Sequence, residues 1–142
     1  MTNLGSLGGA GYATGINDSG RVVGFSQDAG FLYKAFLYNG VSMVNLGTLV
    51  GGAESYATSI NNSGQIVGVS QVNGLRNHAF LYTSGSMIDL GTLDGGGDSA
   101  ATGINKAGQI VGQSHTARLP VQRRVDGRPW HPGRSLQHSS WH

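Results

Sequence analysis

The sequence contains no cysteine, only three prolines and few charged residues, which make up 11% of its 142 residues. Without cysteine, a disulfide framework and a thiolate metal site are both excluded. No apolar run approaches the roughly 20 residues that a membrane-spanning helix needs. The first residues also lack the basic and apolar regions of a secretory signal. We therefore expect no membrane partner, and the residues given carry no export signal of their own.

Glycine, by contrast, is abundant. There are 25 glycines, and they do not follow the triplet period of collagen. A glycine-rich chain with few charges is typical of many short strands joined by tight turns. The composition therefore favours an all-β fold over one built from long helices.

One motif occurs three times, at residues 13–26, 57–70 and 100–114. Its isoleucines, Ile16, Ile60 and Ile104, are 44 residues apart in both steps. In a repeat protein, each unit buries its apolar face against a neighbouring unit. The spacing therefore predicts an array of similar units rather than a conventional single domain.

The motif itself predicts a β-hairpin. Its turns begin with asparagine and end with glycine, as in the segment from Asn17 to Gly20. An asparagine side chain can accept hydrogen bonds from backbone N–H groups two residues on, and glycine accepts a positive φ. The second strand has β-branched residues on both faces, which indicates cover on both sides. The glycine within that strand allows a neighbouring backbone to come close.

Two further strands are expected in each unit. They cover residues 34–38 and 43–46 in the first unit and residues 78–82 and 87–90 in the second. Four short antiparallel strands in about 44 residues match a β-propeller blade in size. Propellers have four or more blades, so we expect an incomplete array that is open or forms part of a larger ring.

The residues that carry these strands also resemble a known family. The segment His-Ala-Phe-Leu-Tyr at 78–82, Asp-Leu-Gly-Thr-Leu at 89–93 and the third hairpin resemble the HAF repeat of predicted extracellular bacterial proteins. The resemblance covers about residues 3–115, with Lys34 in place of the family's histidine in the first unit. It implies a β-propeller-like fold and a secreted location. It implies no catalytic residues.

The repeat pattern ends near residue 116. We expect residues 1–116 to hold the last strand of a unit, at Leu4 to Leu7, then two full units and half of a third. Residues 118–142 contain five arginines and one aspartate, a charge of +4, whereas the rest of the chain has a charge of −2. Such a change in composition predicts a boundary.

A shifted reading frame explains part of this tail. Residues 128–142 can be back-translated, with a free choice of synonymous codons, and read from the second base of each codon. They then encode the missing Leu-Gly-Thr-Leu, a glycine loop and Ala-x-Gly-Ile, although residues 118–127 restore no strand. Our hypothesis is that residues 117–142 are out of frame, were not selected to fold and are disordered. Despite its arginines and tryptophans, we expect no specific nucleic-acid partner for this tail.

Metal binding and catalysis find little support in the sequence. The glycine-rich loop from Asp94 to Asp98 could hold calcium, but the other units have no matching acids. We expect no metal, no cofactor and no catalytic residue. The recurring serines are interpreted as structural hydrogen-bonding groups: Ser26, Ser70 and Ser114. The five histidines show no ligand spacing at shared repeat positions: His78, His115, His131, His138 and His142.

The tyrosines leave one alternative open. They recur in pairs, as Tyr12 with Tyr56 and Tyr38 with Tyr82. Packing explains this recurrence, and a carbohydrate-stacking surface is the functional alternative. We therefore expect a non-catalytic repeat scaffold or interaction module with a protein or glycan partner. A lectin-like surface is the second hypothesis and a remnant of a propeller enzyme the third. Open sheet edges also predict self-association.

Overall fold

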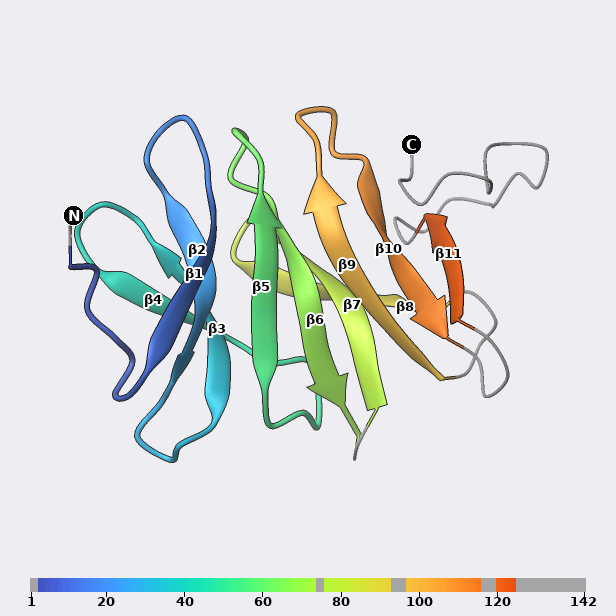
Figure 1. Cartoon of the computed structure of the whole chain (residues 1–142), viewed down its shortest axis with the longest axis horizontal. Coiled ribbons are helices and arrows are strands. Elements are labelled where there is room, and N and C mark those ends of the chain that lie inside the picture. The colour runs from blue at the N-terminus through green and yellow to red at the C-terminus, as the bar shows by residue number, and fades with distance from the viewer. Residues whose placement is uncertain (1–2, 74–75, 93–96, 116–119, 125–142) are drawn as a thin grey trace.

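The chain forms three antiparallel sheets that follow one another along its long axis (Figure 1). This computed structural model describes residues 3–73, 76–92, 97–115 and 120–124. The first sheet contains β1 (Gly11–Ile16), β2 (Val22–Gln27), β3 (Tyr33–Tyr38) and β4 (Met43–Gly47). The second contains β5 (Ser55–Ile60), β6 (Ile66–Val72), β7 (Arg76–Thr83) and β8 (Ser86–Gly91). The third contains β9 (Asp98–Ile104), β10 (Ile110–His115) and β11 (Pro120–Arg124).

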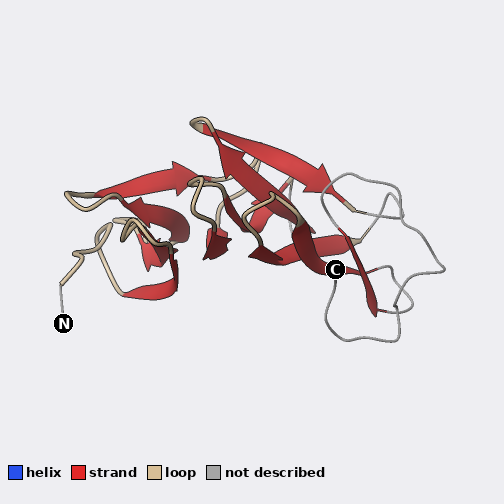
Figure 2. Ribbon diagram, turned by 90° about the horizontal axis from the view of Figure 1, so that it is seen from above, coloured by secondary structure: helices blue, strands red, loops and turns tan. Residues whose placement is uncertain are grey.

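The predicted all-β class and the four-stranded antiparallel units are confirmed. The first two sheets have the strand orders β1-β2-β3-β4 and β5-β6-β7-β8, so each strand pairs with the next one in the chain. Strands are the only regular elements of the described residues (Figure 2). No helix in that part of the chain is long and apolar enough to cross a membrane.

The start of the chain differs from the prediction. Residues 3–10 form no strand, although Leu4 to Leu7 match the last strand of a unit. In the complete units β4 and β8 pair with β3 and β7, and no described residue precedes this segment to give it such a partner. The segment still occupies the equivalent place, because Leu7 N donates to Ser26 Oγ at 3.1 Å as Leu49 N does to Ser70 Oγ at 2.8 Å.

The third sheet also contains more than the predicted half unit. Strand β11 lies within the segment predicted to be a tail and pairs with β10 in antiparallel register. Residues 116–119 and 125–142 lie outside the described residues, so most of the segment covered by the reading-frame hypothesis does too.

The hairpin turns are built as the sequence predicts. In the first unit, Asn17 Oδ1 accepts hydrogen bonds from Ser19 N at 3.1 Å and Arg21 N at 3.0 Å. Gly20 closes this turn with φ of +79°. Asn61 and Asn105 make the same pair of bonds in the second and third units.

A β-bulge and a close backbone contact recur in every first hairpin. The register skips Thr14, Thr58 and Thr102, which leaves one extra residue in the first strand of each unit. In the second strand, a Cβ atom added at Gly68 would overlap the carbonyl oxygen of Tyr56. The predicted role of this glycine is therefore confirmed, because only glycine fits beside that carbonyl.

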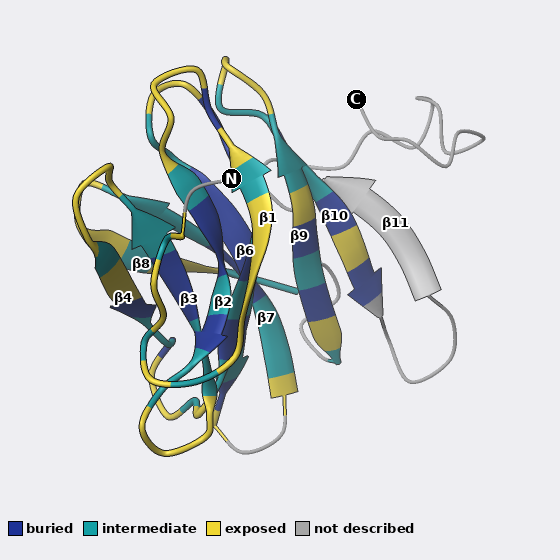
Figure 3. Cartoon of the chain, turned by 60° about the vertical axis from the view of Figure 1, so that its left-hand side comes forward, coloured by how far each residue is buried: buried dark blue, intermediate teal, exposed yellow. Residues whose placement is uncertain are grey.

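The apolar core lies between the sheets. One cluster joins the first two units and includes Val23 and Leu46 on one side and Ala57 and Ile60 on the other. A second cluster joins the second and third units and includes Val67, Ala79, Ala101 and Ile110. Both faces of β6 are buried, as predicted, whereas β1 at the start of the array is exposed (Figure 3). Stacking of units therefore supplies the core.

Candidate binding surface at the junctions between units

Side-chain hydroxyls bridge each pair of neighbouring units. Ser55 Oγ in β5 accepts from Ala35 N at 2.8 Å and donates to Gly47 O at 2.6 Å. Ser99 joins the next two units in the same way, since it bonds to Ala79 N and Gly91 O. Both serines are buried. Because a buried N–H or C=O group needs a partner, these hydroxyls have a structural role.

The serines singled out in the sequence are also structural. Ser26 and Ser70 are fully buried and accept hydrogen bonds from the backbone of Leu7 and Leu49. Ser114 is buried at the matched position of the third unit. The structural interpretation is thus confirmed for Ser26 and Ser70.

Four aromatic rings close the junction between the first two units. Tyr12, Phe25 and Tyr33 come from the first sheet, and Tyr56 comes from β5. The ring centroids of Phe25 and Tyr56 are 5.0 Å apart in an edge-on arrangement, and those of Tyr33 and Tyr56 are 5.8 Å apart. Of the two tyrosines that recur at this position of the repeat, Tyr12 and Tyr56, the first is 53% exposed. Tyr82, by contrast, packs against the core cluster.

A carboxylate is bound to this aromatic cluster. Glu54 Oε1 accepts from the Tyr56 hydroxyl at 3.1 Å, and Glu54 Oε2 accepts from Tyr33 N at 3.1 Å. Burial, followed by the nearby Glu54 charge, raises the pKa of Tyr56 to about 12. Burial and the neighbouring Tyr12 also raise the pKa of Tyr33. The Tyr56 phenol therefore remains protonated at neutral pH and donates its hydrogen bond to Glu54.

The equivalent position at the next junction is an open groove. Tyr56 takes the place of Tyr12 there, and the other three rings are replaced, since Val69, Asn77 and Ala100 correspond to Phe25, Tyr33 and Tyr56. The space that rings fill at the first junction becomes a groove of about 490 Å³. Its lining consists of Tyr56, Val69, Asn77, Asp98, Ser99, Ala100 and Gln113. We call it the Tyr56 groove.

Polar groups surround the tyrosine in this groove. Asp98 Oδ1 accepts from Asn77 N at 2.9 Å, which repeats the contact of Glu54 with Tyr33 N. The residue that corresponds to Tyr56 is Ala100, so no phenol is available there to bind the second carboxylate oxygen of Asp98. An aromatic wall beside amide and carboxylate groups can bind a ligand with both apolar and hydroxyl-bearing surfaces.

Other polar side chains form local pairs. His78 Nδ1 lies 2.9 Å from Asp89 Oδ1, and Lys34 Nζ lies 2.8 Å from Asp28 Oδ2. The hydrogen bond from Lys34 is the main cause that lowers the pKa of Asp28. Each pair lies within a single unit.

No group of three or more metal-binding side chains occurs in the described ranges. Of the candidate calcium loop, Asp98 is described and lines the Tyr56 groove, whereas residues 94–96 lie outside those ranges. Among the histidines, His131, His138 and His142 also lie outside the described residues, and His115 ends β10.

Three residues that fill the first junction are absent from the sequence-based prediction: Phe25, Tyr33 and Glu54. Phe25 and Tyr33 do not recur in the second unit, where Val69 and Asn77 replace them. A search for recurring residues therefore passes over them. The signal that identifies them is the opposite one, a departure from the repeat at two neighbouring positions.

The chain matches no protein-family model. Comparison with curated proteins and with solved structures likewise gives no match.

Proposed function

We propose that this protein is a non-catalytic repeat scaffold or interaction module, with propeller-like units of the HAF type that act outside the cell. The observation that carries this proposal is that the recurring polar side chains form structural hydrogen bonds. The recurring threonine and asparagine of each unit, and Ser26 and Ser70 in the first two, bond to the backbone of their own or a neighbouring unit. Groups held in this way stabilise an array and are poorly placed to attack a substrate.

The propeller-like arrangement is supported by how the units pack. Successive sheets contact each other through β5 and β9, the first strands of the second and third units. These strands lie side by side with β1 along the array (Figure 1). In a propeller, four-stranded sheets pack in the same order around a central axis. The secreted location is supported by the HAF resemblance alone.

A panel of hydrolase and transferase substrates tests the non-catalytic proposal. We expect no turnover with the intact chain at any pH between 5 and 9, a range that includes the ordinary titration of histidine. Turnover of any substrate, and above all turnover that is lost in Gln113→Ala, an exposed residue of the Tyr56 groove, would contradict the proposal. Ser42→Ala, an exposed serine in the β3–β4 turn, is the control.

Glycan binding at the Tyr56 groove is the second candidate function. The observation that favours it is the combination of a tyrosine ring with Asn77, Asp98 and Gln113 around one open groove. Sugar rings present apolar faces that stack on aromatic side chains and hydroxyls that bond to amides and carboxylates.

A glycan array with three variants tests this candidate. Tyr56→Phe retains the ring and should retain binding, whereas Tyr56→Ala should abolish it. Gln113→Ala should weaken binding without affecting the fold, because the Gln113 side chain is exposed. Tyr12→Ala is the matched control in the filled junction. No signal on the array, or an equal signal from the Tyr56→Ala variant, would refute glycan binding at this groove.

A further inference from the structure

The N-terminal face of the first unit is the uncovered counterpart of a buried face. In the second unit, the first strand buries Ala57 completely and leaves Ile60 only 8% exposed. The matching residues of β1, Ala13 and Ile16, are exposed, with Ile16 at 67% (Figure 3). The difference arises because β5 packs on the first unit, whereas no described unit packs on the N-terminal side of the first sheet.

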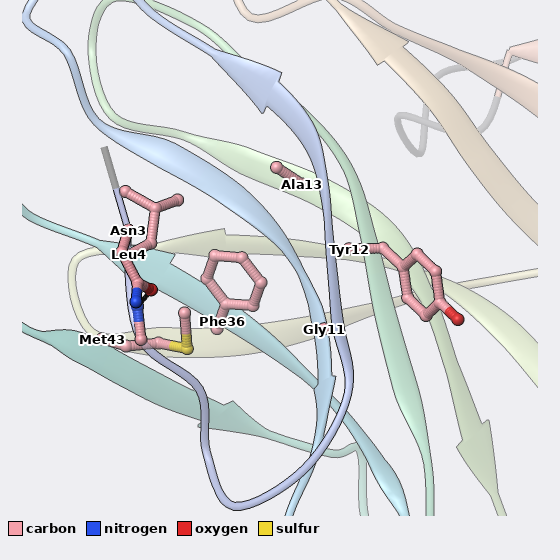
Figure 4. A pocket seen from close by; sticks show the side chains of 8 residues that line it. Asn3, Leu4, Gly11, Tyr12, Ala13, Phe36 and Met43 are labelled. Carbon is pink, nitrogen blue, oxygen red and sulfur yellow. Dashed lines mark hydrogen bonds between the residues drawn. The ribbon is translucent and has the colours of Figure 1, made fainter. Parts of the chain in front are cut away.

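A pocket of about 410 Å³ lies on this uncovered face. Leu4, Phe36 and Met43 gather on one side of β1, and the Tyr12 ring lies on the other (Figure 4). The pocket and the exposed Ile16 together give the face an apolar centre.

The two internal junctions show which contacts this face accepts. At the first junction, Thr14 Oγ1 donates to Ala57 O at 2.7 Å, and Asn17 Nδ2 donates to Asn61 O at 3.1 Å. The second junction repeats both bonds, from Thr58 Oγ1 to Ala101 O at 2.7 Å and from Asn61 Nδ2 to Asn105 O at 3.0 Å. In both cases the earlier unit donates to the backbone of the later one.

The third unit carries the same donors. Thr102 is exposed, and within the described residues its hydroxyl has a single contact, with Val111 O at 3.4 Å. Asn105 Nδ2 donates to Gln109 Oε1, as Asn61 Nδ2 does to Gln65 Oε1. Asn61 Nδ2 also donates across a junction to Asn105 O, and for Asn105 this second bond has no counterpart among the described residues. Within the described residues, therefore, nothing covers the donor end or the acceptor end of the array.

The charges at the two ends are complementary. At the first junction, the side chains of Asp18 and Asn62 meet with 2.7 Å between Oδ2 and Nδ2. In the third unit, the residue that corresponds to Asp18 and Asn62 is Lys106. A further junction of the same kind would therefore place Lys106 of one unit beside Asp18 of another, which forms an ion pair.

From this continuity with the internal junctions we infer that the N-terminal face binds the third unit of a second copy of this chain, in a head-to-tail arrangement. Thr102 donates to Ala13 O of the second copy, Asn105 donates to its Asn17 O, and Lys106 pairs with its Asp18. Such an interface is heterologous, so it produces a closed ring or a filament. The inference rests on the proposed scaffold role and makes no use of the Tyr56 groove.

Gly11 agrees with this pairing. It replaces the serine found at Ser55 and Ser99, whose hydroxyls reach the third and fourth strands of the preceding unit. The third unit has no fourth strand among its described residues. Among the described residues, the third unit therefore lacks the fourth-strand carbonyl group that a hydroxyl at position 11 would bond, so glycine at that position loses no such contact.

Sedimentation equilibrium over a range of protein concentrations tests the inference. We expect the intact chain to associate, and Ile16→Asp to weaken association at least about tenfold, because it places a charge in the apolar centre. Val41→Asp is the matched control. Val41 is 88% exposed, and its counterpart Gly85 stays exposed although units pack on both sides of it. The two variants should have equal thermal stability as monomers.

A charge exchange makes the test specific. Asp18→Lys and Lys106→Asp should each weaken association about three- to tenfold, and less in high salt. A mixture of these two variants should associate like the intact chain, since every junction then joins opposite charges. A monomeric intact chain would overturn the inference and leave the scaffold proposal standing. Association that is unaffected by Ile16→Asp and by both charge variants would also overturn it, and would point to pairing at sheet edges.

Discussion

Removal of one buried hydroxyl should measure how strongly the units are joined. Ser55 Oγ serves two backbone groups of the first unit, the N–H of Ala35 and the C=O of Gly47. Ser55 and Ala35 are both fully buried. In Ser55→Ala these two groups lose their partner, and each unpaired buried group costs about 1–3 kcal/mol. Because Gly47 is only half-buried, its carbonyl loses less than the full penalty, and we expect the free energy of unfolding to fall by about 2–4 kcal/mol.

Urea denaturation followed by circular dichroism measures this loss. Ser42→Ala is the control, because Ser42 is exposed in a turn and its replacement should change stability by less than about 0.5 kcal/mol. Ser99→Ala should cost a similar amount to Ser55→Ala, since it leaves Ala79 N and Gly91 O unpaired. If Ser55→Ala were no more destabilising than Ser42→Ala, the reasoning that these hydroxyls hold the units together would be refuted.

Two further predictions concern the aromatic cluster and the first hairpin. The pKa of Tyr56 is raised to about 12 from an ordinary value of 10, so the contribution of this phenol to stability is complete below pH 10 and is lost as the pH rises through about 12. An absorbance titration of the phenols should show a late step that Tyr56→Phe removes and that Glu54→Gln moves to lower pH. An unchanged titration in Tyr56→Phe would contradict the assignment. Gly68→Ala should destabilise the protein severely, by about 3 kcal/mol or more, because its Cβ overlaps the Tyr56 carbonyl. Gly15→Ser is the control in the same assay: Ser59 holds the matched position of the second unit, so this variant should lose much less.

Much of the fold could be predicted because it depends on features that every unit shares. The hairpin turns follow from Asn17 and Gly20 and their counterparts, whose side chain and positive φ are local requirements. The role of Gly68 is also predictable, because a glycine that interrupts a run of β-branched residues in a strand indicates a close approach of the neighbouring backbone. Such local requirements leave a pattern that repeats every 44 residues.

The ends of the array were harder to predict, because pairing there depends on partners elsewhere in the chain. Leu4 to Leu7 repeat the pattern of a strand, yet they form none, and the described residues offer them no third strand as a partner. Conversely, β11 pairs with β10 although its residues lack the repeat pattern. An open edge of β10 accepts backbone hydrogen bonds from a strand of almost any sequence.

The binding surface escaped prediction for a different reason. Recurrence identifies what every junction shares, whereas the Tyr56 groove exists because one junction differs from the other. Tyr12 and Tyr56 were found because they recur. Phe25 and Tyr33 are replaced by Val69 and Asn77, and this change opens a groove because the sheets pack side by side, which the linear pattern does not reveal.

Hydrogen exchange at Ala35 N tests the central claim most directly, namely that buried hydroxyls join each unit to its neighbour. This amide donates to Ser55 Oγ across the junction. It should exchange as slowly as the paired strand amides and become much faster in Ser55→Ala, whereas Val41 N, exposed in a turn, should exchange fast in both proteins. Rapid exchange at Ala35 in the intact chain, or slow exchange that Ser55→Ala leaves unchanged, would contradict the account.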